Sequence, residues 1–156
     1  GQGSFQFGMQ QLEKLNLIDL IKKKALIDKI PTLGICLGMQ LFADLGYEKE
    51  KTTGLGFIKG EIKKISTSLK LPHIGWNEVS FEQKNDLFLG LDNDKDFYFV
   101  HSYYFDCLRS ENILAKTNYD FKFPSIVRNN NIIGFQFHPE KSLKNGFKLL
   151  NNFLQI

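Results

Sequence analysis

The residues best suited to chemistry are a cysteine and a histidine–glutamate pair that lie far apart in the chain. Cys36 stands in Gly34-Ile-Cys-Leu-Gly38, between an apolar run that predicts a strand and an amphipathic run, 39–45, that predicts a helix. A strand, a sharp glycine-flanked turn and a helix are typical of a nucleophile elbow, where the helix N-terminus favours a thiolate. Taken alone, the pattern fits a buried structural cysteine equally well.

The second motif is Phe137-His-Pro-Glu140, which follows a predicted strand. Residues two apart on extended backbone point to the same side, so the Glu140 carboxylate can orient the His138 imidazole. Cysteine, histidine and carboxylate are the nucleophile, base and orienting group of a catalytic triad. His138 alone would be interpreted as a histidine at a strand end, but together with Cys36 it favours a catalytic site.

These residues need a framework, and the apolar spacing predicts one. Leu12, Leu15, Ile18 and Ile21 predict one helix over 7–24, extending toward residue 27. Ser142 is the expected N-cap of a last helix that packs Phe147, Leu150, Phe153 and Leu154 on a core. The predicted strands are 32–35, 61–66, 78–81, 97–105, 113–117, 123–128 and 132–137, with loops at 52–56, 71–77 and 129–131.

Size and composition limit the alternatives. A chain of 156 residues predicts one domain, 1–156, with early alternation of helices and strands indicating a mixed sheet flanked by helices. The net charge of +3 comes from scattered lysines, so we expect no nucleic-acid partner. No membrane span or signal peptide is predicted. Cys36 and Cys107 have neither disulfide nor metal spacing, which fits a reducing cytoplasm without a metal or cofactor.

The motifs resemble those of a known family. Gly34-Ile-Cys-Leu-Gly-Met-Gln40 and Phe137-His-Pro-Glu140 resemble the class I (triad) glutamine amidotransferases. The segments 72–77, 97–103 and 136–142 narrow the resemblance to the glutaminase subunits of imidazole glycerol phosphate synthases, in histidine biosynthesis. The resemblance covers the whole chain and implies an α/β three-layer sandwich with a mixed, mostly parallel, flavodoxin-like central sheet. It also implies that an N-terminal βαβαβ portion of the family is missing, so we expect this chain alone to be poorly stable or inactive.

The resemblance implies a mechanism and roles for particular residues. Cys36 would attack the side-chain amide carbon of glutamine, His138 would carry the proton to the departing ammonia, and Glu140 would hold His138. Gln40 would bind the substrate; otherwise it fits a partly exposed helix residue. The remaining residues matched to oxyanion or substrate binding are Leu37, through its backbone N–H, the loop glycines Gly1 and Gly3, and the segment His101-Ser102-Tyr103, which would otherwise fit strand packing.

The ammonia would pass to a partner, a barrel-type cyclase subunit, within a heterodimer. By resemblance, four residues lie at or near that interface: Trp76, Asn77, Tyr98 and Lys141. An exposed tryptophan is a reasonable interface anchor, although a core position for Trp76 is equally compatible with the sequence. We interpret His73 as a loop histidine and Cys107 as structural.

Three alternatives stay open. A paralogous subunit could supply ammonia to a different synthase, for example one that amidates surface sugars. A non-catalytic binding domain could keep the fold, although the presence of Cys36, His138 and Glu140 together argues against it. Other cysteine hydrolases of similar layout, such as γ-glutamyl peptidases, can share the elbow and the histidine.

Overall fold

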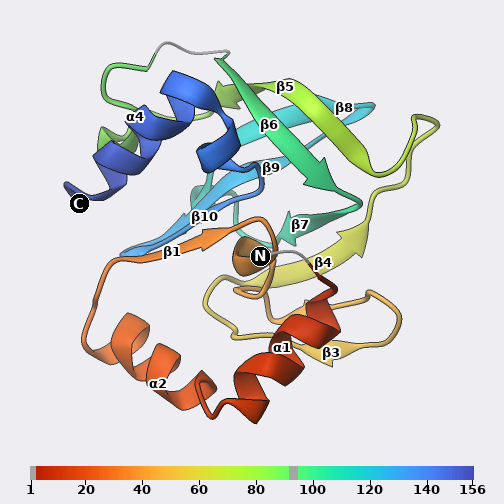
Figure 1. Ribbon diagram of the computed structural model, residues 1–156, viewed down its shortest axis with the longest axis vertical. Coiled ribbons are helices and arrows are strands. Elements are labelled where there is room, and N and C mark those ends of the chain that lie inside the picture. Colours follow the sequence, from red (N-terminus) through yellow and green to blue (C-terminus); the bar gives the residue numbers. More distant parts are fainter. Residues whose placement is uncertain (1–2, 92–94) are drawn as a thin grey trace.

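The computed structural model describes residues 3–91 and 95–156, and its largest element is a six-stranded sheet (Figure 1). The strands lie in the order β1-β10-β9-β8-β5-β6. Their bounds are β1 Thr32–Ile35, β5 His73–Phe81, β6 Lys95–His101, β8 Ile113–Tyr119, β9 Phe121–Asn129 and β10 Ile132–Phe135.

The large sheet is mixed, which agrees with the predicted α/β class. Among its described strands, β1 and β10 pair in parallel, whereas the other neighbours pair antiparallel. The expectation of a mostly parallel sheet is therefore wrong for these strands. The physical reason is connection length: β9 and β10 are joined by Asn130 and Asn131, and so short a link can join only antiparallel strands. Asn130 has a φ of 55°, as such a tight turn requires.

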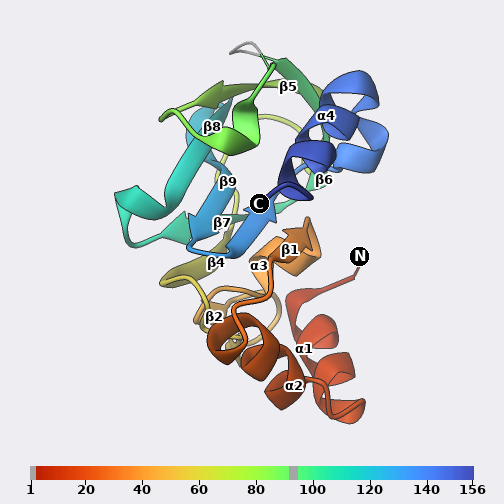
Figure 2. The same cartoon turned by 90° about the vertical axis from the view of Figure 1, so that its left-hand side faces the viewer.

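Helices and a second, smaller sheet cover the two faces of the large sheet (Figures 1 and 2). On one face lies α4, Leu143–Phe153, whose Leu149 packs into a core rich in phenylalanine side chains. On the other face lie α3, Leu37–Gln40, and a four-stranded sheet in the order β3-β2-β4-β7. The small sheet consists of β2 Leu45–Gly46, β3 Thr52–Thr53, β4 Gly60–Lys64 and β7 Tyr103–Cys107.

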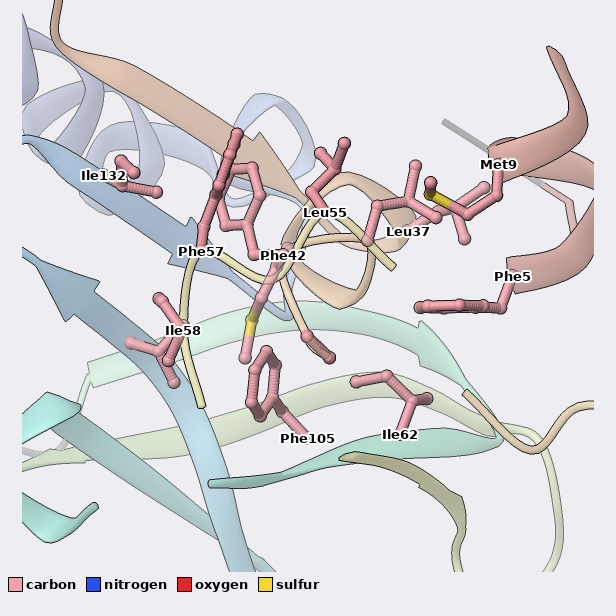
Figure 3. Packing of buried hydrophobic residues seen from close by; sticks show 14 of the residues in the cluster. Phe5, Met9, Leu37, Phe42, Leu55, Phe57, Ile58, Ile62, Phe105 and Ile132 are labelled. Atoms are coloured by element: carbon pink, nitrogen blue, oxygen red, sulfur yellow. The ribbon is translucent and has the colours of Figure 1, made fainter. Parts of the chain in front are cut away.

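A second apolar core fills the space beneath the large sheet. Figure 3 shows Phe42 and Phe57 side by side, with Phe105 elsewhere in the same cluster and Phe5 and Met9 entering from the N-terminal helix. The two cores lie on opposite faces of β10, because Ile132 belongs to this cluster and Ile133 to the one under α4. This alternation produces the layered arrangement expected of the fold.

The N-terminal segment differs from the single helix predicted over 7–24. It forms α1, Phe5–Lys14, then α2, Ile18–Lys22, which continues into a π-helical turn, Lys23–Ile27. Asn16 interrupts the helix with a φ of 54°, and Leu15 is 61% exposed. The apolar recurrence therefore reflects two short amphipathic helices joined by a bend.

Two predicted strand boundaries also shift. β5 begins at His73, so most of the predicted loop 71–77 is strand; Pro72 precedes the strand and does not interrupt it. The predicted strand 97–105 is divided at Ser102, because β6 belongs to the large sheet and β7 to the small one. The remaining short elements are 3₁₀ turns at Asp86–Phe88, Ser110–Asn112 and Pro139–Lys141.

The last helix is present, but the predicted capping hydrogen bond is absent and only part of the predicted apolar face packs on the core. Ser142 stands at the N-cap position without a capping hydrogen bond, since its hydroxyl donates to the His138 carbonyl instead. Leu150 and Phe153 pack on the core, whereas Phe147 and Leu154 are exposed. The hydroxyl is thereby used to hold the histidine segment.

The turn between β1 and α3 requires a glycine at one of its two flanking positions. A Cβ placed on Gly34 would lie 2.6 Å from the carbonyl carbon and oxygen of Gly38, whereas a Cβ on Gly38 would meet nothing within 4 Å. The strand end and the first helical turn thus pass too close for a side chain at Gly34. Gly38 faces open space, although both glycines were expected to serve the turn.

We therefore expect Gly34→Ala to lower the free energy of unfolding by about 1–3 kcal/mol, because backbone must move to admit the methyl group. Urea denaturation measures this loss. Gly38→Ala is the matched control and should change stability by less than about 1 kcal/mol, with helix propensity favouring alanine. Equal stabilities of Gly34→Ala and the unsubstituted chain would contradict the close approach.

Candidate active site

Cys36 lies at the apex of the turn between β1 and α3, in a strained backbone conformation. Its φ is 50° and its ψ is −107°, a region that residues with a Cβ rarely occupy. The Cys36 N–H donates to the Phe135 carbonyl at 2.7 Å, and the Cys36 carbonyl accepts from the Gln40 N–H at 3.2 Å. These bonds hold the strained residue in the geometry predicted for a nucleophile elbow.

The helix after the elbow is shorter than predicted. α3 ends at Gln40, because the carbonyls of Leu41, Phe42 and Ala43 accept hydrogen bonds from the segment 55–58 instead of continuing the helix. A single turn provides only a small dipole. The dipole of so short a helix therefore does little to stabilise a Cys36 thiolate, contrary to the expectation from the sequence.

The Cys36 thiol is buried, with two hydrogen-bonding neighbours. Its Sγ lies 3.7 Å from the Val100 carbonyl, to which the thiol donates, and 3.8 Å from the Gln136 Nε2, from which it accepts. Burial raises the pKa of the Cys36 thiol, while the Leu37 N–H and the Gln136 amide act in the opposite direction. Since the pKa is raised overall, the thiol needs a base to become a nucleophile.

His138 and Glu140 form a close pair. The His138 Nδ1 lies 2.7 Å from a Glu140 carboxylate oxygen, and Nδ1 must donate because a carboxylate accepts. Glu140 belongs to the 3₁₀ turn that starts at Pro139, so it reaches the imidazole across a turn and not along the extended backbone expected from the sequence. With Nδ1 occupied, Nε2 is the nitrogen able to accept a proton in the neutral imidazole.

One strand positions both the cysteine and the histidine. The carbonyls of Tyr98 and Val100, two residues apart on β6, accept from the His138 N–H at 2.8 Å and from the Cys36 thiol. The charge of Glu140 raises the pKa of the Cys36 thiol, so this carboxylate lies within electrostatic reach of the sulfur. The structure thus gathers the three proposed triad residues at the same end of the large sheet.

A cavity of about 260 Å³ opens beside Cys36. It is lined by Gly3, Cys36, Leu37, Gln40, Glu48, Pro72, Val100, His101, Ser102 and Tyr103. All the predicted oxyanion and substrate residues are here except Gly1, which lies outside the described residues. His138 and Glu140 are not part of this lining. Gly3, with a φ of 140°, faces Leu37: a Cβ placed on it would lie 3.8 Å from a Leu37 methyl carbon.

Gln40 is buried and its amide nitrogen is fully used. Its Nε2 donates to the Tyr103 carbonyl at 3.0 Å and to the Gln136 Oε1 at 3.1 Å. A side-chain amide nitrogen has two hydrogens, so what Gln40 can offer a ligand is its carbonyl oxygen. The alternative of a partly exposed helix residue does not hold.

His101 and His73 form a buried chain behind the cavity. The His101 Nδ1 donates to the Tyr103 carbonyl at 2.8 Å, which leaves its Nε2 to accept from the His73 Nδ1 at 2.9 Å. The His73 Nε2 then accepts from the Asn77 amide at 3.2 Å. Burial lowers the pKa of His101 to about 3 and that of His73 to about 4, so both rings are neutral at pH 7. His73 is therefore a buried strand residue, not the loop histidine expected.

Three of the four predicted interface residues form one surface cluster, which we name the Trp76 cluster: Trp76, Tyr98 and Lys141. Trp76 is 49% exposed and its ring meets Tyr98 edge-on at 5.9 Å between centroids. The Lys141 ammonium lies 5.8 Å from the centre of the Tyr98 ring. Asn77 points away from this cluster, toward His73 and the Asn118 carbonyl.

Three residues of the site received no role from the sequence. Glu48 lines the cavity and accepts from the Phe5 N–H at 2.8 Å, Gln136 contacts the thiol, and His73 supports His101. The available signal was a polar Gln136 within an apolar strand; Glu48 stands among other charged residues without a signal.

In the described part of the chain, no group of metal-ligating side chains and no helix able to cross a membrane is found.

The neutral histidines predict how stability depends on pH. Unfolded imidazoles bind protons below about pH 6.5, but His73 and His101 remain neutral in the fold down to about pH 4 and about pH 3. Their contribution to stability is thus present above pH 6.5 and is lost as the pH falls. Urea unfolding between pH 7 and pH 4 should show this loss.

His101→Asn is the matched variant, since its amide nitrogen can replace Nδ1 as donor to the Tyr103 carbonyl without titrating. Its unfolding free energy should fall less steeply, by about 1.4 kcal/mol per pH unit where one further proton is bound only by the unfolded chain. Equal slopes for the two proteins would contradict the buried neutral state of His101.

Comparisons with known proteins identify the family to which the chain belongs. The family model for class I glutamine amidotransferases matches residues 11–156. The chain is 47% identical over 158 residues to imidazole glycerol phosphate synthase subunit HisH 1 of Campylobacter jejuni, covering 100% of this chain and 78% of the relative. It is 48% identical over 157 residues to subunit HisH 2 of Methanococcus maripaludis, covering 99% and 77%.

Solved structures agree with the fold. A crystal structure of a glutamine amidotransferase superposes with a TM-score of 0.73 at 18% identity, over 98% of this chain and 74% of the other. A glutamine amidotransferase from Thermotoga maritima gives 0.64 at 18% identity, over 99% and 60%. From the family match over most of its length, the chain belongs to the class I glutamine amidotransferases. Within them, it is similar over its whole length to HisH subunits of imidazole glycerol phosphate synthase.

Proposed function

We propose that this protein is the glutaminase subunit of an imidazole glycerol phosphate synthase, hydrolysing glutamine and delivering ammonia to a barrel-type cyclase partner in histidine biosynthesis. The observation that carries the proposal is a strained, buried Cys36 that lines a cavity of about 260 Å³, while the same strand, β6, accepts hydrogen bonds from Cys36 and from a histidine bound to Glu140. The relatives' names favour this pathway over a paralogous synthase. The two free cysteines fit a reducing cytoplasm.

The first chemical step is activation of the thiol. His138 accepts the Cys36 proton at Nε2, and Glu140 stabilises the resulting imidazolium through Nδ1. The sulfur then attacks the side-chain amide carbon of glutamine. The oxyanion that develops accepts from the Leu37 N–H, with the Gly3 loop as the second donor. His138 returns the proton to the leaving ammonia, and water hydrolyses the thioester.

The cavity walls support recognition of the amino-acid end of glutamine. Gln40 can offer a ligand its carbonyl oxygen, because both of its amide hydrogens are used in the wall. Glu48 adds a carboxylate to the same cavity. Two oxygen acceptors suit the α-ammonium group, and the backbone N–H groups of Ser102 and Tyr103, which line the same cavity, suit the α-carboxylate. The side-chain amide then lies toward Cys36.

The Trp76 cluster supports a docking site for the cyclase partner. It combines a half-exposed tryptophan with a tyrosine and a lysine, residue types suited to interface anchors and polar rims. It also adjoins the catalytic pair, because Lys141 follows Glu140 in the same turn. Ammonia released near His138 would therefore leave close to the partner.

Substitution of the triad tests the reaction. Cys36→Ala should abolish glutamine-dependent ammonia release measured with the partner present, and His138→Asn should reduce kcat by about 10²–10⁴-fold through loss of the base. Cys107→Ala is the matched control and should retain activity, because Cys107 lies outside the cavity. Ammonia release by Cys36→Ala at the parent rate would refute the proposed function.

Substitution of Trp76 tests the docking site. Trp76→Ala should weaken binding to the histidine-pathway cyclase by about 10-fold or more, as expected for a central aromatic anchor. Leu20→Ala is the control: Leu20 is equally exposed, at 49%, and belongs to α2, which lies at the opposite end of the molecule from β5 in Figure 1. Titration calorimetry measures both. Equal affinities for the two variants would place the partner elsewhere.

A further inference from the structure

Gln136 is a fully buried amide that the mechanism above does not use. It follows β10, between Phe135 and Phe137, whose rings stack on one another in the core under α4. The Gln136 side chain points to the other side, where its Nε2 lies 3.8 Å from the Cys36 Sγ. A polar side chain with no exposed surface therefore ends on the proposed nucleophile.

The neighbouring hydrogen bonds fix which end of the Gln136 amide faces the sulfur. Gln40 Nε2 donates to the Tyr103 carbonyl, which can only accept, so this atom of Gln40 is the nitrogen. Its second hydrogen goes to Gln136 at 3.1 Å, so the contacted Gln136 atom is the oxygen. Rotating Gln136 by half a turn would set two amide nitrogens against each other. Gln136 therefore presents its N–H groups to Cys36.

A donor fixed in this way interacts unequally with the two forms of the thiol. A hydrogen bond to a charged acceptor is roughly twice as strong as one between neutral groups. The fixed amide thus stabilises the sulfur most when it has lost its proton, and it needs no rearrangement to do so. It lowers the pKa of the Cys36 thiol, against the larger effect of burial, which raises it.

We propose that Gln136 is a further catalytic residue, which donates a hydrogen bond to the Cys36 thiolate, and that Gln40 is the residue that positions it. This rests on the proposed role of Cys36 as the nucleophile. When the proton moves from Sγ to the His138 Nε2, the negative charge forms on the sulfur, and the Gln136 N–H and the Leu37 N–H face it. Formation of the thioester removes the charge, and with it the need for the donor.

The test measures the thiol titration directly, with neither glutamine nor partner present. In a Cys107→Ser background, the rate of Cys36 alkylation by iodoacetamide is followed against pH, since only the thiolate reacts. Gln136→Met is similar in size but lacks the donor, and we expect it to raise the midpoint by about one pH unit. Gln136→Glu keeps the acceptor for Gln40 and replaces the donor with a carboxylate, so its midpoint should also rise.

Ser125→Ala is the matched control for a disturbed core. Ser125 is fully buried on β9, and its carbonyl accepts a hydrogen bond from the backbone N–H of Gln136 at 2.9 Å. Its hydroxyl has no partner among the described residues. In Ser125→Ala, the pH midpoint of Cys36 alkylation should stay within about 0.2 pH units of the parent value. This is well below the shift of about one pH unit expected for loss of the donor. The proposal is overturned if either Gln136 variant, folded as judged by its urea transition, titrates with the parent.

Kinetics with the partner separate this proposal from the proposed function. Loss of the donor in Gln136→Glu, which keeps the acceptor for Gln40, should lower kcat for glutamine hydrolysis by about 10-fold and leave KM near the parent value, because Gln136 is not part of the cavity lining. An unchanged midpoint in Gln136→Met refutes the donor role, whatever the turnover of the parent. Unchanged turnover in Cys36→Ala refutes the proposed function, whatever the midpoint.

Discussion

Burial of polar groups away from water is the constraint on which the site depends. Behind the cavity, burial favours the pairing of each amide and imidazole donor with a protein acceptor. The chain of hydrogen bonds runs from Asn77 through His73 and His101 to the Tyr103 carbonyl, which also accepts from Gln40. Gln40 then orients Gln136, which ends at the Cys36 sulfur. Since carbonyl acceptors fix the directions, every proton in this chain has a single position.

The same burial determines how Cys36 must work. Burial raises the pKa of its thiol, so the resting side chain is protonated and held by the Val100 carbonyl. A buried, protonated thiol is a weak nucleophile, so it depends on a base to react. With the strained φ of 50°, the Cys36 sulfur lies between the Val100 carbonyl and the Gln136 amide, beside the cavity. Strain and burial thus leave the resting thiol unreactive until a base removes its proton, which is the role proposed for His138.

The sequence predicts what is local and misses what depends on pairing between distant segments. The elbow could be predicted because Gly34 and the apolar runs on either side of Cys36 favour a tight strand-to-helix turn. The contact between His138 and Glu140 could be predicted because it spans only two residues. By contrast, His73 lies opposite His101 because β5 and β6 pair with these two residues in register. The sequence does not indicate this pairing, since the segment around Pro72 resembles a loop. Gln136 meets Gln40 because β1 and β10 run side by side.

Tyr98 links the surface to the chemistry. Its ring lies in the Trp76 cluster, between Trp76 and the Lys141 ammonium, while its carbonyl accepts the His138 N–H and its own N–H donates to the Ser142 hydroxyl. That hydroxyl in turn donates to the His138 carbonyl. The backbone of His138 is thus held on both sides by groups tied to one surface residue. A partner docked at the proposed site on Trp76 and Tyr98 would therefore contact the strand whose carbonyls accept hydrogen bonds from His138 and Cys36.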